Sequence, residues 1–376
     1  MASESPLHNL QEQAEAEFLY YGDDESGVEI VATYGELEAE YAAIRKSAGL
    51  MDLPQRAVLR ITGADRLAFL NNMVTNAVAE MTSGSAVSSF WLNQRGRIVA
   101  DLSFLELGDE MLADTEGAVA DGAMSTLTDF VFTEDVTIES AHESWHRLAL
   151  HGPRGIELVR KVASFASDEA ADDWSSRGCR RVRIADEPVI VERRDTTGEI
   201  GLELFVPTTA ALEVYETLLE AGLDSGARSI GWLAYNIARI ESGVPLFLVD
   251  FGTDSLPHET GLLRERVSFT KGCYLGQEVV ARMENLGHPS KRLVGLRVEG
   301  NSMPVTGSQI FEPADRPSEV VGAVTSATPS PMLGDEVIAL AMVKWSRSNA
   351  GQRLLVSAEG AIVPATVTEL PFWKRR

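Results

Sequence analysis

Apolar and polar positions follow helical and strand periods in turn, which predicts a chain of mixed α and β structure. Helical spacing begins at Glu36 and runs to a stop at Gly49. Two-residue alternation then predicts strands at 57–61, 88–93, 97–105, 148–150, 188–193 and 202–206. Further helices are expected at 155–162, 210–221 and 231–241. Periodicity alone therefore gives two α+β stretches.

Beyond Ser290 the pattern changes. Short runs rich in Val and Leu alternate with Gly, Pro and Ser turns, which is typical of a small all-β barrel. Because 376 residues exceed one ordinary core, several domains are expected. We predict an acidic, loosely held N-terminal arm over 1–34, α+β parts over 35–144 and 145–288, and a β-barrel over 289–376.

Charge and cysteine content narrow the class of protein. The net charge of −23 argues against direct nucleic-acid binding, which draws on clustered Lys and Arg. Cys179 and Cys273 are too sparse for a disulfide framework, so reduced thiols and a cytoplasmic location are expected. We expect no signal peptide, no membrane span and no metal site, because no segment or His/Cys spacing favours one.

The most specific motif is Phe269–Arg282, which reads FTKGCYLGQEVVAR. It closely resembles the KGCYxGQE signature of the YgfZ family, the folate-binding helpers of iron–sulfur cluster assembly or repair. Weaker blocks resemble the wider glycine-cleavage T-protein (aminomethyltransferase) superfamily, in chain order. These blocks are Ala48–Asp52, Thr197–Glu203 (TGExGxE), Arg239–Gly243 (RxExG), Gly322–Ser326 with Ser330-Pro331, and Leu370–Phe372.

This resemblance implies an α+β fold, a three-domain cloverleaf whose two α+β parts bind folate and whose C-terminal domain is a small β-barrel. It implies tetrahydrofolate as the cofactor. Iron–sulfur proteins or their assembly machinery are the implied partners, with tRNA-modifying enzymes among the candidate clients.

Cys273 is the first candidate for chemistry. Lys271 precedes it by two residues, and a helix is expected to start near Gly276, so a cation and a helix dipole would both favour the thiolate. The alternative is a buried, inert cysteine, which is the commoner fate of the residue. The motif around Cys273 and Lys271 favours a functional thiol.

Glu203 lies in the predicted strand 202–206, on the face opposite Leu202 and Leu204. Spacing alone makes it an exposed strand residue. The TGExGxE resemblance instead implies that its carboxylate accepts two parallel N–H donors from a pterin. Glu199 is a weaker second candidate, with a turn as the alternative.

Arg239 lies on a helix otherwise committed to the core. It either pairs with a folate carboxylate or braces Glu241 or another carboxylate. The resemblance places Tyr235 where family transferases often show an additional Arg, which implies that folate is held differently here.

Asp101 ends the run Gly96–Asp101. Family aminomethyltransferases carry an adjacent Asp pair at this strand and use one Asp to engage the reacting folate nitrogen, so Asp101 is the candidate for that role. Here the pair reads Ala100-Asp101. Asn93 offers a polar contact or only turn chemistry. His142 and His146 have helical spacing and are expected at the surface.

Three functions follow. The first is a folate-dependent helper of iron–sulfur enzymes, centred on Cys273. The second is a one-carbon transferase of the T-protein type, which Ala100 and Cys273 count against, so no appreciable aminomethyl transfer is expected. The third is a folate-binding module without turnover.

Overall fold

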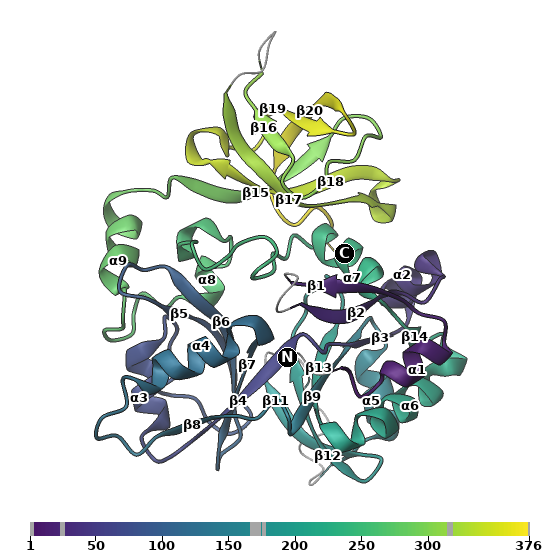
Figure 1. Cartoon of the computed structure of the whole chain (residues 1–376), viewed down its shortest axis with the longest axis vertical. Helices are drawn as coiled ribbons and strands as arrows, with labels where there is room; N and C mark the ends of the chain where they lie inside the picture. The colour runs from purple at the N-terminus through teal and green to yellow at the C-terminus, as the bar shows by residue number, and fades with distance from the viewer. Residues whose placement is uncertain (1–3, 23–26, 166–173, 175–177, 314–318, 375–376) are drawn as a thin grey trace. The chain divides into compact units, whose positions relative to one another are not determined.

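The structure is a computed structural model that describes residues 4–22, 27–165, 174, 178–313 and 319–374 (Figure 1). The chain divides into two compact units, one of residues 1–91 and 100–235, the other of residues 92–99 and 236–376. The KGCYLGQE segment thus belongs to the same unit as the C-terminal strands. The finer division predicted from the sequence stays a prediction.

Two sheets dominate the first unit, and both are built mainly from antiparallel pairs. One sheet has the order β5-β6-β7-β4-β8, and the other has the order β10-β11-β12-β13-β9-β3-β14. The strands of the five-stranded sheet are β4 (Arg56–Thr62), β5 (Ala86–Leu92), β6 (Ile98–Glu106), β7 (Met111–Glu116) and β8 (Thr137–Ser140). Those of the seven-stranded sheet are β3 (Gly49–Asp52), β9 (Trp145–His151), β10 (Ser164–Phe165), β11 (Cys179–Ile184), β12 (Glu187–Arg193), β13 (Gly201–Pro207) and β14 (Arg228–Ser229).

The seven-stranded sheet is covered on both faces, which explains its near-continuous apolar strands. On one face, Leu202 and Leu204 of β13 pack with Val159 of α5 and Leu218 of α6. On the other face, Phe205 packs with Val58 and other apolar residues of the five-stranded sheet. Helices of this unit are α2 (Leu37–Lys46), α3 (Arg66–Met73), α4 (Gly117–Thr128), α5 (Gly155–Val162) and α6 (Ala211–Gly222), and α7 (Trp232–Glu241) crosses into the second unit.

The predicted helix stop at Gly49 is wrong. Helix α2 ends at Lys46, and Gly49 opens β3. A Cβ at Gly49 would lie 2.8 Å from the side chain of Ile230, so the glycine allows close packing of two strands. Gly49 is therefore explained by a tertiary contact and not by a helix cap.

The expectation of a loosely held arm is wrong for the described N-terminal residues. They form α1 (His8–Gln13) and the hairpin of β1 (Glu17–Tyr21) and β2 (Val28–Thr33), and Leu7 is fully buried. The buried carboxylate of Asp52 accepts hydrogen bonds from Ser5 Oγ (2.5 Å) and Gln11 Nε2 (2.6 Å). Hydrogen bonds to Asp52, which lies much further along the chain, therefore hold this segment in place.

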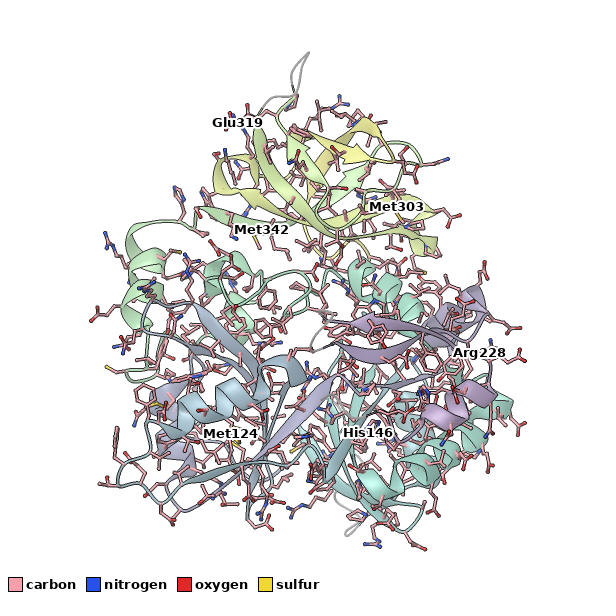
Figure 2. All side chains as sticks on the ribbon, in the orientation of Figure 1. Met124, His146, Arg228, Met303, Glu319 and Met342 are labelled. Carbon is pink, nitrogen blue, oxygen red and sulfur yellow. The ribbon has the colours of Figure 1, made fainter. Side chains whose placement is uncertain are left out.

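His146 is a third partner of Asp52, with Nε2 to Oδ1 at 2.6 Å, and it is labelled in Figure 2. It lies buried on β9, whereas His142 follows the end of β8 and is exposed. The helical spacing of the two histidines is therefore accidental, and the prediction that His146 is a surface residue is wrong.

The predicted C-terminal barrel is confirmed. Six strands close in the order β15-β18-β17-β16-β19-β20, with β15 also paired to β20. Their bounds are β15 (Lys291–Val298), β16 (Gln309–Phe311), β17 (Val320–Ser330), β18 (Glu336–Lys344), β19 (Arg353–Ala358) and β20 (Ala361–Thr368). Before the barrel, the second unit contains α8 (Leu263–Arg266) and α9 (Gln277–Leu286). Among the described helices, none is long and apolar enough to span a membrane.

Candidate functional site

Charged side chains gather where the two large sheets of the first unit face each other. Apolar residues such as Val58 and Phe205 fill one end of this interface. At the other end lies a group that we call the sheet-interface cluster. Its members are Arg56, Asp114, Glu116, Arg147, Glu192, Arg194 and Glu203.

Strand register brings these residues together. In the five-stranded sheet Arg56 of β4 lies opposite Glu116 of β7, and Ser103 of β6 lies opposite Asp114. In the seven-stranded sheet Glu192 of β12 lies opposite Glu203 of β13. Because side chains alternate between faces, all of these point into the space between the sheets.

Arg147 lies at the centre of the cluster and is fully buried. Its guanidinium donates to Asp114 and, at 2.8 Å, to Oε2 of Glu203. Its carbon Cζ lies 3.6 Å from the ring centre of Phe205. Its Nε has no hydrogen-bond partner within the described part of the chain. Arg147 thus joins the two sheets and leaves one buried donor unused.

Two more arginines complete the cluster. Arg56 donates to Asp114 at 2.5 Å and to Glu116 at 2.5 Å. Arg194 donates to Asp114 at 3.0 Å and to Glu192 at 2.6 Å, and Glu192 also accepts from Ser103. Asp114 is therefore shared by three guanidinium groups.

The cluster separates the proton affinities of its carboxyl groups. Burial alone would raise the pKa of Asp114, but the charges of Arg147, Arg56 and Arg194 outweigh it and lower the pKa. Burial raises the pKa of Glu116, and the neighbouring Asp114 and Asp101 add to this against the opposing charge of Arg56. Two carboxyl groups two residues apart are thus driven in opposite directions.

The cofactor candidate Glu203 is buried, so the alternative of an exposed strand residue is wrong. Its Oε2 is already occupied by Arg147, while Oε1 accepts no hydrogen bond within the described residues. Each carboxylate oxygen can accept about two hydrogen bonds, so Oε1 and a second site on Oε2 suit a paired donor. Glu199 is also buried, in the loop before β13.

The candidate Tyr235 belongs to a row of aromatic rings in the first unit. Its ring centre lies 5.1 Å from that of His151 and 5.8 Å from that of Trp232, which in turn lies 5.2 Å from Tyr21. Burial lowers the pKa of His151 to about 4, and its Nδ1 has no hydrogen-bond partner among the described residues. A neutral, buried imidazole therefore ends the row.

Asp101, the catalytic candidate, lies on β6 and is partly exposed. Its carbonyl oxygen accepts a hydrogen bond from Thr115 Oγ1 at 2.9 Å. Asn93 supports the turn, since its Oδ1 accepts from the backbone N–H groups of Arg95 and Arg97.

Arg239 belongs to the second unit, where it braces a carboxylate, which is one of the two roles predicted for it. Its Nη1 donates to Asp250 at 2.5 Å, and its Nη2 donates to Ser326 at 2.5 Å. The braced carboxylate is therefore Asp250. The other named candidate, Glu241, accepts from Ser330 instead. A folate contact by Arg239 stays a prediction that its complete burial does not favour.

The KGCYLGQE segment runs into the start of α9, and the predicted helix start near Gly276 is confirmed, since α9 begins at Gln277. Cys273 is exposed and free. Burial lowers the pKa of Lys271 to about 8, and its Nζ lies 4.9 Å from the ring centre of Tyr274. Gly276 has φ +79°, and a Cβ there would lie 2.6 Å from the carbonyl oxygen of Asn93. That motif glycine thus has a steric role.

Cys179 differs sharply from Cys273. It is buried in the first unit, and burial raises the pKa of its thiol to about 12. Its neighbours Arg180 and Arg181 oppose this shift without overcoming it. These arginines therefore do not activate Cys179.

Sequence reasoning missed the core of the cluster, namely Arg56, Asp114, Glu116, Arg147 and Arg194. One signal was available, because Arg147 directly precedes the apolar run 148–150 and Asp114 directly follows the apolar run 111–113. Such a charge is almost always paired when buried. The described residues contain no group of three or more His, Cys, Asp or Glu side chains suited to a metal ion.

Comparison with family models gives two matches that together span nearly the whole chain. Residues 7–271 match the GCVT N-terminal domain, and residues 291–374 match the glycine cleavage T-protein C-terminal barrel domain.

Individual proteins are similar over the same length. An aminomethyltransferase of Cutibacterium acnes is 32% identical over 379 aligned positions, covering 99% of this chain and 98% of the relative. An aminomethyltransferase of Caldanaerobacter subterraneus subsp. tengcongensis is 26% identical and covers 99% and 96%. The crystal structure of glycine cleavage system aminomethyltransferase T from Bartonella henselae matches with a TM-score of 0.86 at 23% identity, over 100% of this chain and 99% of that one. The last likeness concerns the fold.

Proposed function

Because the chain belongs to the family of the glycine cleavage T-protein, we propose that it is a tetrahydrofolate-dependent aminomethyl- or one-carbon transferase. Tetrahydrofolate is the folate that this family uses. The observation that carries the proposal is the match over 99% of the chain to a relative named as an aminomethyltransferase. It supports the transferase better than the iron–sulfur helper, which the KGCYLGQE motif had placed first.

The chemistry of the sheet-interface cluster suits this substrate. A pterin presents parallel N–H donors, and the buried Glu203 carboxylate offers acceptor sites on Oε1 beside the Arg147 contact on Oε2. Arg147 also places a positive charge against this carboxylate. Asp101, on the facing sheet, supplies a carboxylate for the reacting nitrogen.

A turnover assay tests the proposal. The purified protein is mixed with tetrahydrofolate and an aminomethyl-loaded carrier protein, and release of ammonia and methylene-tetrahydrofolate is followed. We expect turnover, and we expect Asp101→Asn to reduce it by about 10²–10⁴-fold, the range for loss of a general acid or base. Absence of turnover above the protein-free rate would contradict the proposal.

The helper of iron–sulfur enzymes is a second candidate, favoured by one observation. The motif thiol of Cys273 is exposed, whereas the thiol of Cys179 is buried with a pKa raised to about 12. Alkylation requires an accessible thiolate. We therefore expect Cys273 to be labelled at least about a hundredfold faster than Cys179 at neutral pH, as read by peptide mass spectrometry.

Complementation separates the two candidates. In a deletion strain of the host, a helper would need Cys273 to restore the activity of iron–sulfur enzymes, so Cys273→Ser would fail. Cys179→Ser is the matched control. Full restoration by Cys273→Ser, with transferase turnover present in vitro, would leave only the transferase.

A further inference from the structure

A second carboxylate lies beside Asp101, although the chain lacks a second Asp next to it in sequence. It belongs to Glu116, at the end of the neighbouring strand β7. Strands β6 and β7 pair with Ser103 opposite Asp114. Side chains alternate between the faces of a strand, so Asp101 shares the face of Ser103 and Glu116 shares the face of Asp114. Continuing the register by two residues along each strand would bring Asp101 opposite Glu116.

Two contacts support this placement. The hydroxyl of Thr115, the residue before Glu116, donates to the carbonyl oxygen of Asp101 at 2.9 Å. The charge of Asp101 is also among the causes that raise the pKa of Glu116. The two carboxyl groups are thus close enough to interact.

The surroundings of Glu116 leave its charge only partly balanced. Arg56 of β4 donates to it at 2.5 Å, but the same guanidinium is shared with Asp114. The charged groups that act most strongly on Glu116 are Arg56 of β4, Asp114 of its own strand and Asp101 of β6. Counting the whole sheet-interface cluster, the guanidinium groups of Arg56, Arg147 and Arg194 meet four buried carboxyl groups and so leave one in excess.

We propose that Glu116 is a positioning residue that works with Asp101 as a cross-strand pair of carboxyl groups and keeps Asp101 able to take up a proton during transfer. This rests on the transferase proposed above. Each bond that a folate nitrogen forms to the transferred carbon releases one N–H proton. When this carbon gives up a bond to the donor, the donor atom keeps the electron pair of that bond and takes up one proton. One proton therefore moves per bond exchanged, nothing is oxidised, and Asp101 carries that proton.

The kinetic test compares Glu116→Gln with Glu106→Gln. Glu106 is a matched control, because it is another buried glutamate of the five-stranded sheet with its own arginine, Arg66, at 2.6 Å. We expect Glu116→Gln to lower the turnover number by about tenfold, less than the loss of a proton-transfer group itself. The acid limb of its pH–rate profile should move to lower pH, because a negative neighbour has gone. Glu106→Gln should keep the wild-type profile.

A purely structural role for Glu116 would lower thermal stability in both variants without moving either profile, and that result would overturn the proposal. The test does not depend on turnover alone. If the wild-type protein shows no turnover, the transferase proposal has failed, and the pair is then tested in the free protein by titration.

For that titration, the protein is labelled with ¹³C at glutamate carboxyl groups, and the signal of Glu116 is assigned through its loss in Glu116→Gln. We expect its midpoint to lie above that of ordinary glutamates and to fall in Asp101→Asn. An unchanged midpoint in Asp101→Asn would show that the two carboxyl groups do not interact, and the inference would be wrong.

Discussion

Two fully buried arginines, Arg147 in the first unit and Arg239 in the second, have opposite surroundings. Arg239 donates through Nε, Nη1 and Nη2 and has one carboxylate partner, Asp250. Asp250 in turn accepts from Arg239, Thr325, Ser326 and the N–H of Leu246. We call this group the Asp250 cluster. Charge and hydrogen bonds are both balanced there.

Arg147 belongs to a network with an excess of carboxyl groups, and its Nε has no hydrogen-bond partner among the residues that the structure describes. Its partner Glu203 has an oxygen that accepts nothing within the described residues. A balanced buried network stabilises the fold, whereas unused donors and acceptors in a buried site are costly unless a ligand or a proton uses them. The comparison therefore favours a structural role for Arg239 and supports our proposal that the sheet-interface cluster is the functional site.

The largest effect is expected from breaking the balanced network. Asp250→Ala leaves the charge of Arg239 buried without a partner, which should lower the free energy of unfolding by about 3–5 kcal/mol. Urea unfolding measures this. Replacing both partners, in Arg239→Met with Asp250→Leu, should recover much of the loss. If Asp250→Ala were as stable as the wild type, the Asp250 cluster would not be structural.

Acid sharpens the contrast between the units, because each contains a histidine whose pKa is lowered by burial. His151 has a folded pKa of about 4, below its ordinary 6.5, since burial disfavours the cation. Its contribution to stability is therefore complete above pH 6.5 and is lost as the pH falls towards 4. The slope is about 1.4 kcal/mol per pH unit, so roughly 3 kcal/mol disappears over this range.

His151→Gln should remove that share of the acid sensitivity in unfolding experiments at pH 7, 5.5 and 4. His258 of the second unit is the control, because burial also lowers its pKa but its contact with Glu284, at 3.3 Å, opposes the shift. His258→Gln should change the acid response less. Equal responses in the two variants would contradict the assignment of His151 as the acid-sensitive site.

Local patterns predicted much of the fold. The barrel, the hairpin around Asn93 and the start of α9 at Gln277 follow from turn residues and periodicity, which act over a few positions. The sheet-interface cluster could not be predicted this way. Arg56 meets Asp114 58 positions later, and Arg147 meets Glu203 56 positions later, so only the register of non-consecutive strands brings them together.

Motif reasoning found some site residues and misjudged others. The resemblance singled out Glu203, which is buried and not exposed as spacing alone predicted, and its arginine partner was not visible in the sequence. Ala100 counted against a transferase because it stands where family transferases have a second Asp. That argument considered only one strand, whereas Glu116 comes from the neighbouring strand. The weight given to KGCYLGQE also overlooked a steric reason for Gly276, which lets the turn at Asn93 approach the start of α9.

The most direct test of the central claim is calorimetric titration of tetrahydrofolate into the wild-type protein, Glu203→Ala and Glu106→Ala. Both variants lose a buried glutamate with an arginine partner, so both should be destabilised to a similar degree. We expect the wild type and Glu106→Ala to bind equally, and Glu203→Ala to bind about 10–100-fold more weakly, because a charged hydrogen bond contributes roughly 1.5–3 kcal/mol. Equal affinity in all three proteins, or no binding to the wild type, would contradict the assignment of the sheet-interface cluster to folate.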